Sequence, residues 1–118
     1  MKQEEVLILI PKIEKYIEYM LNVILKIPRT EKFNIGNEYK VSMYKMLANA
    51  IYINKVGNRI EYLNKIDAEL VLERIYLRLM LKNKWIDEKK FKVSMELIYE
   101  IGKIVGGLIK YYAKNNKK

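Results

Sequence analysis

Four long stretches of this chain repeat their apolar residues at steps of three and four, and this spacing limits the possible folds most strongly. Such spacing places apolar side chains on one face of an α-helix. The stretches cover about residues 11–27, 35–55, 59–82 and 88–114, and short polar segments separate them. Helices of this length joined by short turns favour an all-α, up-down-up-down four-helix bundle.

Proline, glycine and capping residues mark the ends of these helices. Pro11 suits the first position of a helix, so the residues before it are expected to form a separate extended arm. Pro28 ends the first helix, Gly57 lies in a tight turn, and Asp87 is a favourable N-cap for the fourth helix. The expected parts of the chain are an N-terminal arm over residues 1–10, a bundle over 11–114 and a frayed basic tail over 115–118.

The third stretch carries two apolar faces, whereas a bundle helix normally needs one. The inward face consists of Leu63, Ile66, Leu70, Leu77 and Leu81. The opposite face consists of Ala68, Leu72, Ile75 and Leu79, and one flank between the two carries Lys65, Glu69 and Glu73. The second face is either ordinary exposed apolar surface or a homo-oligomer interface. We favour the interface, because a contiguous ladder of Leu and Ile is large for a surface left in water.

The composition excludes several kinds of site. The 118 residues include no cysteine and no histidine, which removes disulfides, thiol chemistry and the commonest general base and metal ligand. No phosphate-binding loop, nucleophile elbow or dinucleotide fingerprint occurs. Apolar runs stay well below the ~20 residues that cross a bilayer. We therefore expect a cytoplasmic protein that is not an enzyme and uses no metal or cofactor.

Positive charge gathers on two of the predicted helices. The chain carries 23 basic and 14 acidic residues, a net charge of +9, which favours phosphate-rich partners. The fourth helix presents an exposed stripe of Lys92, Lys103, Lys110 and Lys114, and the third a basic edge of Arg74, Arg78 and Lys82. A single stripe is more often a solvated surface. If an oligomer repeats it, nucleic-acid binding becomes the favoured interpretation.

Glycines interrupt the helical pattern of residues 100–110. Each costs an α-helix about 1 kcal/mol relative to alanine. Gly102 and Gly106 lie at the edge of the inward face. We expect a neighbouring helix to approach closely there, and a seat for a ligand or a partner helix is the alternative.

Two segments resemble motifs of a known family. Residues 27–36 read Ile-Pro-Arg-Thr-Glu-Lys-Phe-Asn-Ile-Gly, and residues 100–110 read Glu-Ile-Gly-Lys-Ile-Val-Gly-Gly-Leu-Ile-Lys. They resemble the aromatic-Pro-Lys-x-x-Arg-Phe-x-Leu-Gly turn and the fourth-helix signature of the Avd-like proteins, the accessory variability determinants of diversity-generating retroelements. This chain departs from the motifs at Ile27, at Lys32 and at Leu108, where tryptophan is common.

The resemblance implies a homopentameric barrel of four-helix bundles without catalytic activity. Such a protein would bind a retroelement reverse transcriptase and its template RNA and would support mutagenic cDNA synthesis. Carried onto this chain, the contacts would be Arg29 and Lys32 in the turn, and Lys103 and Lys110 in the fourth helix. The other basic residues named above are candidates by charge alone.

Two other functions stay open. The four-helix proteins encoded in ribosomal RNA intervening sequences share the proline turn, but their Asn-Ile-Ala-Glu-Gly signature is replaced here by Met-Leu-Ala-Asn-Ala-Ile at residues 46–51. The third possibility is an oligomeric scaffold whose charge serves solubility. Gene neighbourhood distinguishes the first two functions, and salt-sensitive RNA binding separates both from the scaffold.

Overall fold

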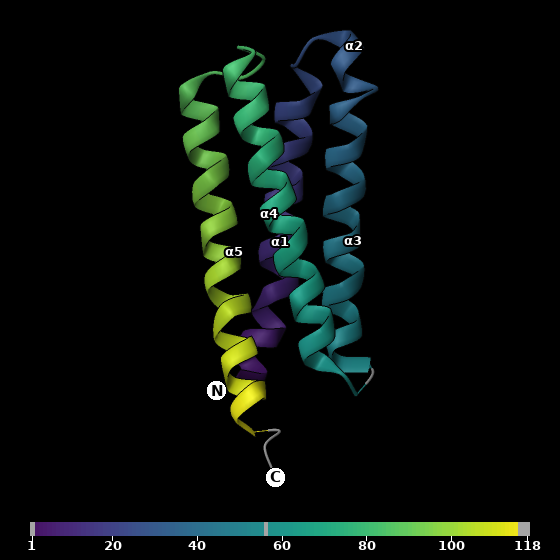
Figure 1. The fold of residues 1–118 in the computed structure, drawn as a ribbon, viewed down its shortest axis with the longest axis vertical. Helices are drawn as coiled ribbons and strands as arrows, with labels where there is room; N and C mark the ends of the chain where they lie inside the picture. Colours follow the sequence, from purple (N-terminus) through teal and green to yellow (C-terminus); the bar gives the residue numbers. More distant parts are fainter. Residues whose placement is uncertain (1, 56, 116–118) are drawn as a thin grey trace.

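The computed structural model describes residues 2–55 and 57–115, and nearly all of them are α-helical (Figure 1). Four helices are long and one is a single turn. Their bounds are α1, Lys2–Leu25; α2, Arg29–Lys32; α3, Ile35–Lys55; α4, Arg59–Lys82; and α5, Glu88–Asn115. The bounds predicted for α3 and α4 are confirmed.

The long helices run side by side and alternate in direction along the chain (Figure 1). The α1 helix packs against α3 and α5, and α4 packs against the same two helices, so α1 and α4 occupy opposite corners. The resulting body measures 51 × 22 × 20 Å. This arrangement confirms the predicted all-α four-helix bundle. None of the described helices is long and apolar enough to cross a membrane.

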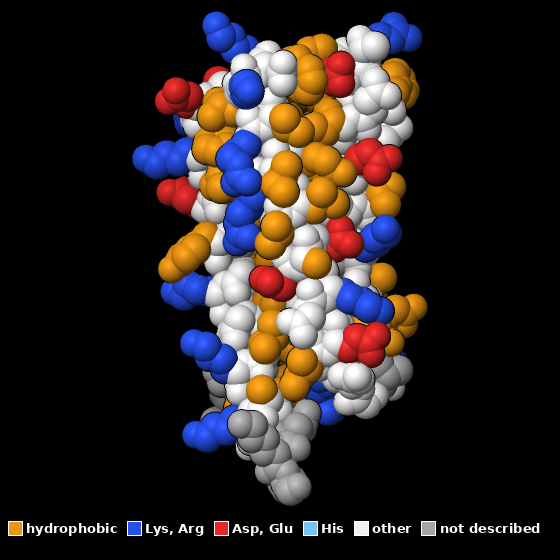
Figure 2. All heavy atoms as spheres, in the orientation of Figure 1, with side chains coloured by type: hydrophobic (Ala, Val, Ile, Leu, Met, Phe, Trp, Pro, Cys, Tyr) orange, Lys and Arg blue, Asp and Glu red, His pale blue; other side chains and the backbone are white. Residues whose placement is uncertain are grey.

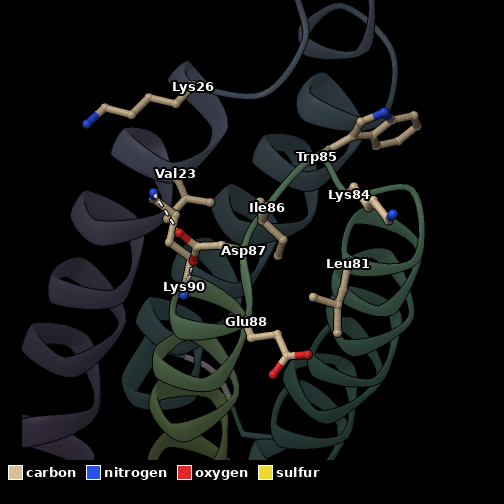
Figure 3. Close-up of a pocket in the computed structure, with 9 residues that line it drawn as sticks. All are labelled: Val23, Lys26, Leu81, Lys84, Trp85, Ile86, Asp87, Glu88 and Lys90. Carbon is tan, nitrogen blue, oxygen red and sulfur yellow. Dashed lines mark hydrogen bonds and ion pairs between the residues drawn. The ribbon is translucent and has the colours of Figure 1, made fainter.

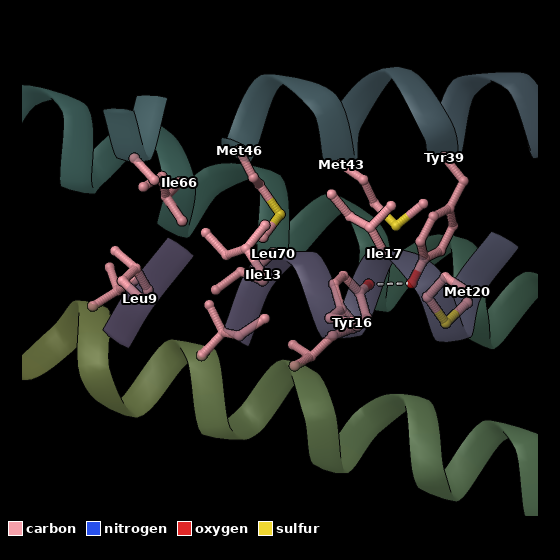
Figure 4. Packing of buried hydrophobic residues seen from close by; sticks show 14 of the residues in the cluster. Leu9, Ile13, Tyr16, Ile17, Met20, Tyr39, Met43, Met46, Ile66 and Leu70 are labelled. Carbon is pink, nitrogen blue, oxygen red and sulfur yellow. Dashed lines mark hydrogen bonds between the residues drawn. The ribbon is translucent and has the colours of Figure 1, made fainter. Parts of the chain in front are cut away.

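Each long helix gives one apolar stripe to a common core. Leu9, Ile13 and Met20 of α1 point into the core that they share with Met43 and Met46 of the neighbouring α3 (Figure 4), and all five side chains are buried. The inward face predicted for α4 is also buried, apart from a half-buried Leu81. Unbranched methionine adapts to irregular gaps in a core, which suits a bundle whose other core residues are mostly branched.

The first helix differs from the prediction. Residues 2–10 are helical and continue through Pro11, so the extended arm expected over residues 1–10 is wrong for its described part. An interior proline costs a helix about 3 kcal/mol. Burial of Val6 and Leu9, which are 1% and 0% exposed, contributes about 1.5–3 kcal/mol each. This burial offsets the cost of the proline.

Local hydrogen bonds explain where the other helices begin and end. Asn58 Oδ1 accepts the Glu61 N–H at 3.1 Å and so caps the start of α4. Asp87 Oδ1 accepts the Lys90 N–H at 2.8 Å, which confirms the N-cap predicted there. The segment expected to be a polar loop instead folds into α2, because the Pro28 carbonyl accepts the N–H groups of the next turn. The α5 helix reaches one residue beyond the predicted bundle, and residues 116–118 of the predicted tail lie outside the described residues.

Candidate nucleic-acid and partner interface

The predicted oligomer interface lies on the outer face of α4. Leu72, Ile75 and Leu79 are 36%, 41% and 44% exposed, and Ala68 is exposed beside them. Figure 2 shows this side of the molecule, where apolar side chains gather along α4 beside a run of Lys and Arg side chains. We call the four residues the α4 stripe. In the single subunit the α4 stripe is exposed to solvent, as the residues of an oligomer interface must be before the subunits assemble.

Most of the predicted basic contacts are exposed, but they are spread along the bundle. Arg78 and Lys82 lie on α4, and Lys92, Lys103, Lys110 and Lys114 follow the outer side of α5. At 1.5 Å per residue, Lys92 and Lys110 are about 27 Å apart along α5. One subunit therefore presents a line of charges rather than a pocket. A line suits an extended polyanion better than a small ligand.

The basic residues of the turn lie at one end of the molecule. Arg29 is exposed and Lys32 is half-buried on α2, at the end where α4 finishes and α5 begins (Figure 1). Lys82 and Lys92 lie towards the same end, whereas Lys110 and Lys114 lie towards the other. The motif residues of the turn and of α5 are thus not brought into one cluster: α2 packs against α3, whereas the lysines follow α5 along the length of the bundle.

An aromatic side chain accompanies the α5 lysines, and the sequence reasoning missed it. Tyr99 is 63% exposed, and Lys103 Nζ lies 5.8 Å from the centre of its ring. Tyr99 also borders a groove of about 820 Å³ between α4 and α5, whose apolar lining includes Leu81, Phe91 and Met95. An exposed ring among lysines can stack on a nucleic-acid base. Tyr99 could have been identified from its spacing in the sequence, because it lies four residues before Lys103 and seven residues after Lys92.

Arg74 has a different surrounding from the other basic residues. It is half-buried, and its Nη2 lies 3.4 Å from the position that a Cβ on Gly102 would take. The small residue therefore accommodates an arginine side chain instead of a helix backbone. At Gly106 an added Cβ would meet no described atom within 4 Å, so the close approach expected there is absent within the subunit. Arg74 is a weaker candidate for phosphate contact than the exposed residues.

A second hollow of about 600 Å³ lies at the end of the bundle (Figure 3). Its lining mixes charges, because Lys26, Lys84 and Lys90 share it with Asp87 and Glu88. Asp87 is already engaged, since it caps α5 and lies 3.7 Å from Lys90 Nζ. The backbone N–H of Lys90 is the main cause that lowers the pKa of Asp87. Over the described residues no cluster of three acidic side chains could hold a metal ion.

The interior contains a polar cluster around Glu73, a residue that the sequence analysis placed on a flank of its helix. Glu73 is 0% exposed. Its Oε1 accepts a hydrogen bond from the Tyr16 hydroxyl at 2.7 Å, and its Oε2 lies 2.6 Å from Ser42 Oγ. Burial raises the pKa of Glu73 from 4.5 to about 7, against the opposing hydrogen bonds from Ser42 and Tyr16. The predicted flank position of Glu73 is therefore wrong.

The spacing of α4 contained the signal for this burial. Glu73 follows Leu70 by three residues and precedes Leu77 by four, so it continues the inward face. Its charge argued for the surface. The partners that make burial possible come from α1 and α3, which no local pattern on α4 can show.

A family model described as bAvd-like matches residues 7–112. No curated protein matches the chain. The matched range contains both the proline turn and the glycine-containing segment of α5 that carry the resemblance. Since it spans nearly all of the bundle, the protein belongs to the bAvd-like family, a family of accessory proteins.

Proposed function

We propose that the protein is a non-catalytic, nucleic-acid-binding accessory protein of a diversity-generating retroelement. In this role it associates with the element's reverse transcriptase and template RNA and supports mutagenic cDNA synthesis. The family match over residues 7–112 is the observation that carries the proposal. The exposed basic line on α5 and the basic turn on α2 support it, because they provide the charge that such partners require.

Assembly is part of this proposal. A closed ring buries the same apolar patch on every subunit, and the α4 stripe is such a patch. A homopentamer, which the family resemblance implies, would carry five copies of a subunit with net charge +9. Repetition of the α5 line around the ring would give one RNA several contacts at once. Each further contact then forms at a high effective concentration.

Salt dependence tests the nucleic-acid contact. If ~6 phosphates are neutralised, affinity for RNA should fall by ~10³ between 50 and 200 mM salt. Fluorescence anisotropy of a labelled RNA at several salt concentrations measures this slope. Affinity that is flat over the range would favour the scaffold whose charge serves solubility.

Charge reversal tests the partner. Substitution of Arg29, Lys32, Lys103 and Lys110 by Glu should abolish co-purification with the reverse transcriptase encoded nearby and cDNA synthesis from the template. A matched control reverses the same number of exposed lysines on other faces: Lys15, Lys45, Lys55 and Lys65. The control should retain both activities. Equal loss in the two variants would show that only net charge matters, and normal cDNA synthesis in the first variant would refute the proposed contacts.

A further inference from the structure

The centre of the bundle contains a continuous line of oxygen atoms that nucleic-acid binding does not explain. It starts at Tyr39 on α3, passes through Tyr16 on α1 and Glu73 on α4, and returns through Ser42 on α3 to Glu69 on α4. The four successive oxygen–oxygen distances are 2.5, 2.7, 2.6 and 2.7 Å. Figure 4 shows the first of these contacts. Only Glu69, at the end of the line, is partly exposed; the other four side chains are buried.

The number of protons in this line can be counted. Each of the four contacts is a hydrogen bond and requires one proton, but the three hydroxyl groups supply only three. Tyr16 donates to Glu73, so Tyr39 donates to Tyr16. Ser42 has a single proton and lies at 2.6 and 2.7 Å from carboxyl oxygens of Glu73 and Glu69. If both carboxyl groups were ionised, one of these two contacts would bring two oxygens together without a proton between them.

We propose that the interior of the bundle is a binding site for one proton, held on Glu73 and shared through Ser42 with Glu69. With this proton bound, Glu73 donates to Ser42 and Ser42 donates to Glu69. Every hydrogen bond of the line is then satisfied, which buried polar groups require. Release of the proton leaves a carboxylate in the core with one unpaired contact between α3 and α4. The proposal does not depend on nucleic-acid binding.

The surrounding groups favour Glu73 as the holder of the proton. Burial is the main cause that raises its pKa, to about 7, and the nearby Glu69 acts in the same direction. Arg74 on α4 acts in the opposite direction. Burial also raises the pKa of Tyr16 and Tyr39 well above the ordinary value, so both hydroxyls keep their protons.

The remaining titratable neighbours of the line are few. Tyr76 on α4 lies beside Tyr39. Burial raises the pKa of Tyr76, and the charges of Glu38 on α3 and of Glu69 and Glu73 on α4 raise it further. Among the described residues no titratable side chain of α5 acts on Glu73; α5 instead presents Gly102 against Arg74. Among the side chains that the structure describes, Glu69 is therefore the only acidic group that can share the proton directly.

A raised pKa in the folded state has a defined effect on stability. The folded chain binds this proton more tightly than the unfolded chain, so stability falls as pH rises from 4.5 to about 7 and is flat above that range. The folding equilibrium constant should drop by about 300-fold across this window because of Glu73 alone. In Glu73→Gln the side chain is neutral at every pH, and its amide can still accept from Tyr16 and donate to Ser42.

Urea unfolding of the full chain at one fixed protein concentration, at pH 5 and at pH 8, tests this expectation. Glu73→Gln should match the wild type at pH 5 within a few-fold and exceed it by roughly 70-fold in folding equilibrium constant at pH 8. The matched control is Glu14→Gln, at an exposed glutamate outside the line, which should keep the pH dependence of the wild type. Parallel behaviour of the wild type and Glu73→Gln would overturn the proposal.

A direct measurement covers the case in which Glu73→Gln does not fold. Carbon NMR of wild-type protein labelled at the glutamate carboxyl should show one glutamate that titrates near pH 7, apart from the others. Infrared spectroscopy at pH 6 should show the C=O stretch of a neutral carboxyl group. If every glutamate titrates near its ordinary pKa, the interior holds no extra proton and the proposal is wrong.

Discussion

The same substitution, glycine to alanine, should have opposite effects at two positions of this bundle. Gly36 is buried in the first turn of α3. A Cβ there would lie 3.0 Å from Ile24 Cγ2 and 3.2 Å from the Glu31 carbonyl oxygen. The Ile24 side chain can move slightly, but the carbonyl cannot move freely, because it accepts the Asn34 N–H at 3.1 Å. In contrast, Gly106 lies inside α5, and a Cβ there would meet no described atom within 4 Å.

The two effects differ in size as well as in sign. Added volume in a packed site costs about 1–3 kcal/mol. Alanine recovers part of the ~1 kcal/mol that glycine costs a helix, and it recovers less in the first turn than in the interior. We therefore expect Gly36→Ala to lose about 1–2 kcal/mol of unfolding free energy. Gly106→Ala should gain up to about 1 kcal/mol, since propensity acts there without a clash.

Urea unfolding followed by circular dichroism measures both variants. Each 1 kcal/mol should also shift Tm by roughly 4 °C for a chain of this size. If Gly36→Ala had the same unfolding free energy as the wild type, the tight packing of the turn against α1 would be refuted. A loss in Gly106→Ala that grows on dilution would show that another subunit covers this position in the assembly, and it would refute the effect calculated from one subunit.

The remaining predictions concern α1 and the α4 stripe. Leu9→Ala should lose about 2–5 kcal/mol of unfolding free energy, because the side chain is 0% exposed; a loss below 1 kcal/mol would show that the start of α1 does not pack as described. Glu substitutions at Leu72 and Leu79 should convert the proposed oligomer into folded monomers, measured by light scattering after size exclusion with circular dichroism as the control for folding. A wild-type mass of 14.2 kDa in that experiment would refute the proposed interface.

The parts of the fold set by local chemistry were predictable from the sequence. Gly57, Asn58 and Asp87 fix helix ends through turns and caps that depend on a few adjacent residues. The end of α3 and the starts of α4 and α5 followed for this reason. Helix faces were also predictable, because apolar spacing depends only on the helix itself. The buried inward face of α4 and the exposed α4 stripe both agree with this spacing.

The failures share a physical cause, which is dependence on distant parts of the chain. Pro11 correctly signals a cost to a helix, but the burial that offsets the cost comes from packing in the bundle. Glycine spacing in α5 suggested close helix approach, yet the group that occupies the space at Gly102 is an arginine side chain of α4. A local rule gives the sign of each contribution and does not show which contribution is larger.

Glu73 shows how two local rules can conflict and how the fold decides between them. Apolar spacing assigned this position to the core, and charge assigned it to the surface. Burial of a lone carboxylate would cost several kcal/mol, so the apolar spacing alone could not bury Glu73. Glu73 is buried because Tyr16 and Ser42 place hydroxyl groups at hydrogen-bond distance from its carboxyl group, although they are 57 and 31 residues away in sequence. A bound proton would also remove the charge. The exposed lysines of α5 involve no such conflict. Their placement is therefore predictable, but their partner is not, because an exposed charge is compatible with a polyanion and with water alone.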